Sequence, residues 1–204
     1  MIPLIATLPE AGRTGWRDEI GNLDAALYSA IAATPTPTLD RYLRALSRAA
    51  DHSKLWIGTA AVLAAAGGRP GRRAAVNGLA SIAATSAVVN LLLKPLSRRR
   101  RPDRCINDVP ITRHVPMPRS TSFPSGHAAS ACAFASGVGI ALPRTGLPLT
   151  ATAALVAYSR VHTGVHYPSD AIAGSVIGTG LTSVVVAALN HQRSKQTEAG
   201  LSTS

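Results

Sequence analysis

Five apolar stretches limit the folds open to this chain. Ala74–Leu93 contains twenty residues without a charge, and Ala171–Leu189 contains nineteen. A helix needs about 20 apolar residues to cross a bilayer, within a range of about 17 to 25. Those two stretches meet this length, Gly126–Leu142 reaches the lower limit, and shorter stretches cover Leu55–Ala66 and Thr145–Ser159. We therefore predict at least three membrane spans and expect five.

The composition supports a membrane environment or a compact helical core. Charged residues make up only 15% of the chain, against roughly 25% in soluble domains. Small residues dominate the apolar stretches, which favours close helix packing in lipid. Strand patterns are absent from the sequence. We predict an all-α fold, a transmembrane helical bundle of five to six helices; the shorter stretches leave core helices of a soluble bundle as an alternative.

The N-terminal third has weaker, amphipathic patterns. Leu23, Leu27 and Ile31 recur at helical spacing, and residues 34–37 (Thr-Pro-Thr-Pro) should end that helix. A second apolar stripe follows, with arginines off the stripe, formed by Leu39, Tyr42, Leu43 and Leu46. Such helices either pack on a core or lie in the membrane interface. We divide the chain into an N-terminal amphipathic segment (1–54), a membrane-embedded core (55–190) and a polar, disordered tail (191–204).

The net charge of +11 raises the possibility of nucleic-acid binding. However, residues 98–101 are the only dense basic run, and aromatic residues make up just 4% of the chain. Stacking platforms for bases are therefore scarce. The two cysteines have neither a disulfide framework nor zinc-ligand spacing. We expect no nucleic-acid partner, no cofactor and no obligate protein partner.

Three polar motifs interrupt the apolar stretches. The first runs from Lys94 to Arg101 and Pro102, the second is Pro124-Ser-Gly-His127, and the third runs from Ser159 to Asp170. The first motif follows the stretch that ends at Leu93, and the second precedes the stretch that begins at Gly126. That stretch and the next one, 145–159, form a hairpin that brings the chain back to the third motif. If each stretch crosses the membrane once, all three motifs emerge on the same face.

The residue types in these motifs suit phosphate chemistry. Lys94, Arg101 and Arg160 would supply three cations, and a phosphoryl group in transfer spreads negative charge over three equatorial oxygens. Ser125 and Gly126 lie where a loop becomes a helix, and free N–H groups at a helix start favour an anion. Taken alone, the second motif is better explained by Ser125 as an ordinary N-cap and Gly126 as a turn residue.

The histidines suit nucleophilic and acid–base roles. His166 and Asp170 are four residues apart, so a helix start would place them on one face. A carboxylate that accepts from one imidazole nitrogen leaves the other free to attack; Asp170 could also complement the helix dipole. His127 could protonate a leaving group, while His162 has no evident task. A metal site built from these residues is disfavoured, because the nearby cations would repel a divalent ion.

The pattern K-x6-R-P, P-S-G-H and S-R-x5-H-x3-D resembles the type 2 phosphatidic acid phosphatase and vanadium haloperoxidase superfamily. The resemblance covers residues 94–170. It implies that His166 attacks phosphorus to form a phosphohistidine, that Asp170 orients His166, and that His127 protonates the leaving group. It also implies a metal-free phosphate site formed by Lys94, Arg101, Ser125, Gly126 and Arg160. Membrane members usually have six spans, so here the first would come from the N-terminal third.

The resemblance implies a multi-pass membrane hydrolase that removes phosphate from a lipid phosphate or diphosphate. A vanadate-dependent haloperoxidase would share the pocket, but those relatives are larger and soluble. Substrates to consider are polyprenyl diphosphates, polyprenyl-linked sugar phosphates, phosphatidylglycerophosphate and phosphatidic acid. The catalytic face holds thirteen basic residues, ten without the three phosphate ligands, against eight opposite, so loop charge does not decide orientation. The resemblance favours an extracytoplasmic site.

Overall fold

A computed structural model describes residues 15–201, and within that range the chain is helical with no strand. Two helices precede the apolar stretches, α1 (Trp16–Ala33) and α2 (Pro37–Ala49). The short 3-10 helix η1 (Asp51–Ser53) leads into the bundle. Each predicted apolar stretch then forms a helix: α3 (Lys54–Ala66), α4 (Gly68–Ala87), α6 (Gly126–Ala141), α7 (Pro143–His162) and α8 (Pro168–Leu201).

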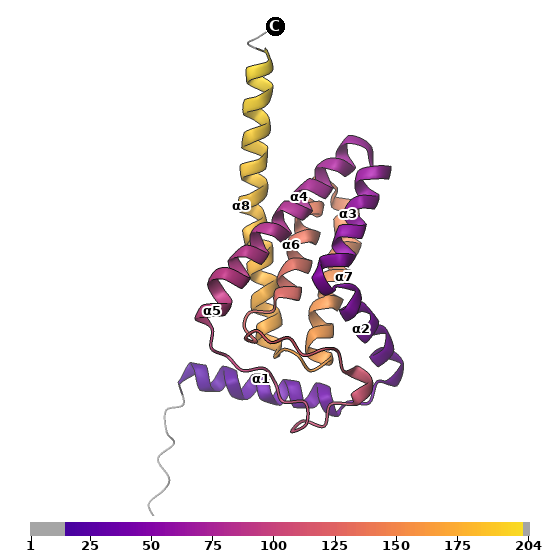
Figure 1. Cartoon of the computed structure of the whole chain (residues 1–204), viewed down its shortest axis with the longest axis vertical. Helices are drawn as coiled ribbons and strands as arrows, with labels where there is room; N and C mark the ends of the chain where they lie inside the picture. The colour runs from indigo at the N-terminus through magenta and orange to yellow at the C-terminus, as the bar shows by residue number, and fades with distance from the viewer. Residues whose placement is uncertain (1–14, 202–204) are drawn as a thin grey trace, which may run out of the picture.

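The bundle is organised around α6, which packs against α4, α7 and α8 (Figure 1). Its core consists mainly of alanine and valine, with Trp56 of α3 against Phe134 of α6 at a ring-centroid distance of 5.4 Å. α8 approaches α6 closely because two glycines face it: a Cβ at Gly178 would lie 2.1 Å from the Ala129 carbonyl oxygen. Gly174 makes a similar approach to Ser125, so the start of α8 is held beside the start of α6.

The end of α4 widens before it reaches the first polar motif. Val88–Leu93 forms a π-helical segment, η2, which continues directly into the short helix α5 (Lys94–Leu96). Pro95 has no N–H to donate to the helical ladder, and the π-helical segment immediately precedes it. Such segments are often found at functional sites, and this one ends directly before Lys94, the first residue of α5.

The C-terminal helix is longer than the sequence pattern suggested. We expected a disordered tail from residue 191, but α8 remains helical to Leu201. Arg193 donates from Nη2 to Asn77 Oδ1 of α4 at 3.2 Å and from Nη1 to Asn190 Oδ1 at 3.1 Å. These contacts tie the first polar turn to the bundle; residues 202–204 lie outside the described range.

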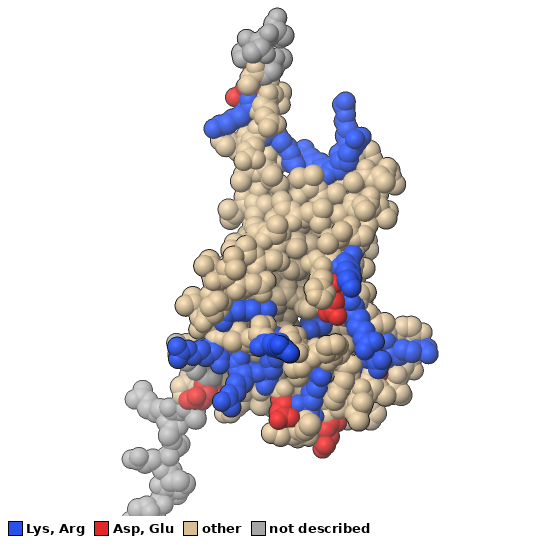
Figure 2. Space-filling model, viewed as in Figure 1, with Lys and Arg blue, Asp and Glu red and all other residues tan. Residues whose placement is uncertain are grey.

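Two described helices are long and apolar enough to cross a membrane, Gly68–Leu96 and Pro168–Ala199. Figure 2 shows Lys and Arg gathered toward both ends of the visible face, with an uncharged band between them. α1 lies across one end of the bundle (Figure 1). One of its faces exposes Trp16, Ile20, Leu23 and Leu27, which is the amphipathic arrangement predicted for an interfacial helix. α2 instead packs on α7 and buries Leu43.

Candidate active site

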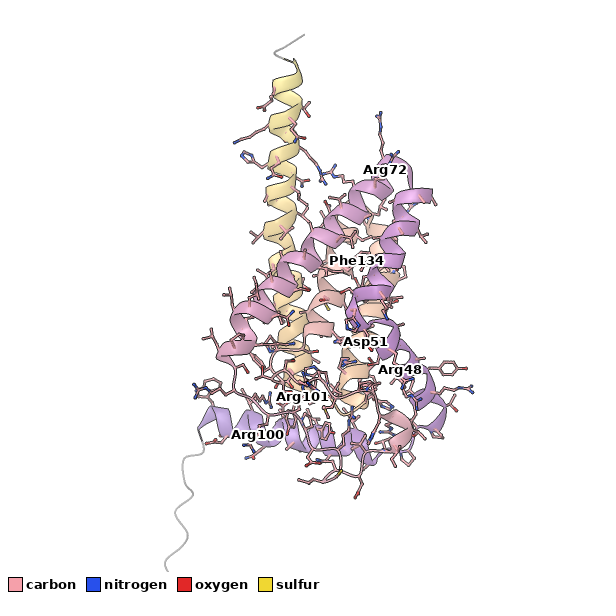
Figure 3. All side chains as sticks on the ribbon, viewed as in Figure 1. Arg48, Asp51, Arg72, Arg100, Arg101 and Phe134 are labelled. Carbon is pink, nitrogen blue, oxygen red and sulfur yellow. The ribbon has the colours of Figure 1, made fainter. Side chains whose placement is uncertain are left out.

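The three polar motifs meet at the end of the bundle that α1 crosses. Backbone hydrogen bonds join them directly: Ser125 N–H donates to the Asp170 carbonyl, and Ser122 N–H donates to the Arg99 carbonyl, each at 3.0 Å. Arg101 Nη1 donates to the Val165 carbonyl at 2.7 Å. Figure 3 shows Arg101 and Asp51 at this end, with Phe134 in the bundle and Arg72 at the opposite end.

His166 is buried between a cation and a carboxylate. Its Nε2 lies 3.1 Å from Arg101 Nη1, and its Nδ1 lies 3.4 Å from Asp170 Oδ2. A proton on Nδ1 facing Asp170 would leave the Nε2 lone pair toward Arg101. Burial lowers the pKa of His166 to about 4; Arg101 acts in the same direction and Asp170 opposes it. The imidazole is therefore neutral near pH 7, as a nucleophile requires.

Asp170 is fully buried and accepts hydrogen bonds from three described neighbours. These are the Ser122 hydroxyl, the Tyr167 N–H at 2.9 Å and Arg99 Nη1 at 2.8 Å. Several donors around one carboxylate stabilise its ionised form and fix its orientation. Asp170 is also a first-turn residue of α8, so the helix dipole favours its charge as well.

The predicted phosphate ligands gather around the same point. Lys94 Nζ and Arg101 Nη2 both donate to the Ser120 hydroxyl, at 3.3 and 3.2 Å. A Cβ at Gly126 would lie 3.5 Å from Lys94 Nζ, so the start of α6 lies against this cation. Arg160 is buried, and its Nε has no hydrogen-bond partner among the described residues. A buried, unpaired guanidinium donor is costly, and an anion would satisfy it.

Ser125 has its expected structural role at the start of α6. It is the N-cap residue, and its hydroxyl accepts from the Ala128 N–H at 3.4 Å. The N–H groups of Gly126 and His127 have no hydrogen bond to any described residue. These two groups remain available to an anion beside Lys94, so the capping role and phosphate binding are compatible.

His127 has a partner that the motif pattern does not reveal. Its Nε2 lies 2.8 Å from Asp51 Oδ1 of η1, and the same carboxylate oxygen is 3.9 Å from Arg160 Nη1. Asp51 is 76 residues before His127, so no local spacing relates the two. The only signal in the sequence is an acidic residue between two helices, which on its own predicts nothing.

Two further aspartates from the N-terminal helices support the site from outside. Asp24 of α1 accepts from Arg99 Nη2 and from the Ser169 N–H, the latter at 2.8 Å. Asp40 of α2 accepts from Arg113 Nε at 2.8 Å and from His162 Nε2 at 2.9 Å. His162 is thus a structural residue, as its lack of an evident task suggested.

Comparisons with known proteins identify the family. The sequence model of the PAP2 superfamily matches residues 74–194, which is more than half of the chain. The chain is also 38% identical over 143 residues to decaprenylphosphoryl-5-phosphoribose phosphatase of Mycobacterium tuberculosis, covering 70% of this chain and 76% of that protein. The chain therefore belongs to the PAP2 superfamily, and it is a phosphatase of that family.

Other relatives differ in their named substrates. The lipid A 1-phosphatase of Rhizobium etli is 34% identical over 110 residues, covering 50% of this chain and 46% of that protein. The fold resembles Aquifex aeolicus LpxE, with a TM-score of 0.66, 23% identity and coverage of 80% and 94%. It also resembles a transmembrane PAP2-type phosphatidylglycerolphosphate phosphatase from Bacillus subtilis, with a TM-score of 0.64, 22% identity and coverage of 85% and 88%.

Proposed function

We propose that this protein is a multi-pass membrane phosphatase that hydrolyses the terminal phosphomonoester of a polyprenyl-phosphate-linked sugar phosphate. The observation that carries the proposal is the meeting of a neutral imidazole, His166, with the cations Lys94, Arg101 and Arg160 at one end of an apolar bundle. The sugar phosphate class is taken from the mycobacterial relative, which is 38% identical to this chain over 143 residues.

The distribution of charge supports the proposed membrane arrangement. α4 and α8 have the length of spans, and we propose that α3, α6 and α7 cross beside them. The apolar face of α1 would lie in the interface at the catalytic end, which we place on the extracytoplasmic side. The protein should remain in the membrane fraction after an alkaline wash; release into the supernatant would contradict this arrangement.

The proposed reaction has two steps at the phosphorus atom. His166 Nε2 forms a bond to phosphorus while the bond to the sugar oxygen breaks, and His127 gives its proton to that oxygen. Water then attacks the phosphohistidine, His127 takes the proton, and inorganic phosphate leaves. Lys94, Arg101, Arg160 and the N–H groups at the start of α6 hold the equatorial oxygens throughout. The three side-chain cations perform the charge neutralisation that a metal ion performs in other phosphatases.

Asp51 acts in this scheme as a positioning residue for His127. Burial opposes protonation of His127 most strongly, and the positive charge of Arg160 acts in the same direction. The Asp51 carboxylate, 2.8 Å from Nε2, favours the protonated ring and leaves Nδ1 to face the leaving group. The acid therefore supports protonation without contacting the substrate.

Phosphate release by the purified protein tests the function. The panel comprises a polyprenyl-phosphoryl pentose phosphate, a polyprenyl diphosphate, phosphatidylglycerophosphate and phosphatidic acid, with His166→Ala as the control. We expect fastest release from the sugar phosphate, full activity in excess chelator and a radiolabelled enzyme intermediate that is stable to alkali and labile to acid. Activity that is lost in chelator and restored by metal would contradict the mechanism, as would an active His166→Ala variant.

A haloperoxidase function has less support. The relatives described above are named as phosphatases or related to them by fold. Oxidation of halide by the vanadate-loaded protein, in the absence of any phosphatase activity, would reverse this preference.

A further inference from the structure

A polar cleft of about 210 Å³ opens beside His127. It lies between η1, the end of α4, the π-helical segment and the start of α6. Lys94, Gly126 and His127 line one part of it, and these residues belong to the proposed phosphate site. The remaining lining side chains include His52, Ser53, Ser86, Asn90 and Ser130.

The position of His127 indicates what the cleft holds. A general acid must lie within hydrogen-bond reach of the oxygen that it protonates. The leaving-group oxygen therefore lies next to His127, with the phosphoryl group on the side of Lys94 and Gly126. The part of the cleft lined by Ser86, Asn90 and Ser130 is then the space for the atoms that follow this oxygen in the substrate.

The lining of this space is neutral and polar. The hydroxyls of Ser86 and Ser130 are 3.4 Å apart, and the Asn90 amide has no hydrogen bond to any described residue. These groups interrupt helices that consist largely of alanine, valine and leucine. A hydrocarbon tail would gain nothing from them, because polar groups lose hydrogen bonds to water when an apolar group covers them.

The backbone around the cleft is also unusual. Asn90 lies in the π-helical segment Val88–Leu93. Side chains in such a segment point in different directions from those of a regular α-helix. Opposite it, His52 and Ser53 adopt positive φ angles of 54° and 59°. Such conformations are costly for residues with side chains and cluster at ligand sites. Both walls of the cleft therefore depart from regular helix geometry at the same place.

We propose that this cleft binds the hydroxyl groups of the sugar that leaves from phosphate, and that it makes the enzyme selective for sugar phosphates over polyprenyl diphosphates. This inference rests on the proposed function. A diphosphate would place a second phosphate group in the cleft, where Lys94 is the only lysine or arginine among the lining residues. A neutral polyol needs hydrogen-bonding groups and no further cation, which is what Ser86, Asn90 and Ser130 provide.

Asn90→Leu tests the proposal, because leucine has a similar size but cannot form hydrogen bonds. The assay compares kcat/KM of the purified full chain for a polyprenyl-phosphoryl pentose phosphate and for a polyprenyl diphosphate. We expect a loss of about tenfold or more on the sugar phosphate and less than about threefold on the diphosphate. Ser130→Ala should also lower kcat/KM more on the sugar phosphate than on the diphosphate, but the difference between the two losses should be smaller than for Asn90→Leu. Equal losses on both substrates, or no loss on either, would overturn the proposal.

Two controls separate this inference from the function on which it rests. Leu91→Ala changes the neighbouring residue, which is 72% exposed and does not line the cleft, so both rates should stay unchanged. His166→Ala should abolish both rates. If His166→Ala is inactive while Asn90→Leu changes kcat/KM equally for both substrates, the proposed sugar site is wrong and the phosphatase proposal stands. If His166→Ala is as active as the parent protein, the proposed function itself fails.

Discussion

The family core and the N-terminal helices contribute different groups to the catalytic end. Residues 74–194, the range matched by the PAP2 superfamily, contain the cations and histidines of the site. α1, α2 and η1 lie before that range and contribute three acids. Asp24 pairs with Arg99, Asp40 with Arg113, and Asp51 with His127.

This difference shows how a cationic site can be held together without its ligand. Several positive groups gathered for phosphate repel one another when the site is empty. The N-terminal acids offset that repulsion from the periphery, and none of them bonds to Lys94 or Arg101. The core would then determine the chemistry, whereas the N-terminal helices would determine stability and orientation. Substitutions in the two regions should separate these contributions.

Replacing the core nucleophile should have the largest effect. His166→Ala should reduce turnover by about a thousandfold or more, because the covalent step has no substitute. Phosphate release measures the loss, and thermal unfolding in detergent should show a retained fold. His191→Ala, a change of an exposed histidine on α8, should have normal activity. Substantial turnover by His166→Ala would contradict the assignment of the chemistry to the family core.

Removing the ion pair between Arg113 and Asp40 of α2 should lower stability instead of turnover. Arg113 is fully buried and also donates to the carbonyls of Ile31 and Thr34. Arg113→Met leaves Asp40 buried with fewer partners, which should cost about 3–5 kcal/mol. Thermal unfolding should shift down strongly, while the folded protein keeps its kcat. Arg41→Met, at an exposed position of the same region, provides the matched control, and equal shifts for both variants would refute the pairing.

Asp51 joins the two regions and should have a kinetic effect of intermediate size. Asp51→Asn should lower kcat by about ten- to a hundredfold on an alkyl phosphate, because it weakens but does not remove a general acid that contributes about a hundred- to ten-thousandfold. An aryl phosphate with a good leaving group needs less protonation, so its rate should fall much less. Asp51→Glu should recover part of the loss, whereas exposed Asp18→Asn should have no effect. Equal losses on both leaving groups would indicate a structural role only.

The pH profile should show the smallest effect. Since the pKa of His166 is lowered to about 4, the neutral nucleophile persists to lower pH than an ordinary histidine allows. The acid limb of kcat/KM should therefore lie well below pH 6.5. Arg101→Gln removes a positive charge beside the ring, which should raise the pKa and move that limb to higher pH. A limb at pH 6.5 in both proteins would contradict the buried environment of His166.

The helices of the core and its chemical residues can be located from the sequence alone. Apolar length and helical spacing are local properties, so they located α3, α4, α6, α7 and α8 and the end of α1 near Thr34. Crossing order along the chain was enough to predict that the three motifs share one face. The spacing of His166 and Asp170 also predicted that they lie together, and they are 3.4 Å apart, although His166 precedes α8 instead of sharing a helix face with Asp170.

The acids that pair with those residues become apparent only when the helices are packed together. Asp24, Asp40 and Asp51 lie 73 to 76 residues before Arg99, Arg113 and His127, and a pairing across such a distance leaves no periodic pattern in the sequence. The helical turns beyond residue 190 and the cleft at Asn90 depend in the same way on contacts between separate helices. Local composition determines where a helix forms, but packing determines which charges it meets.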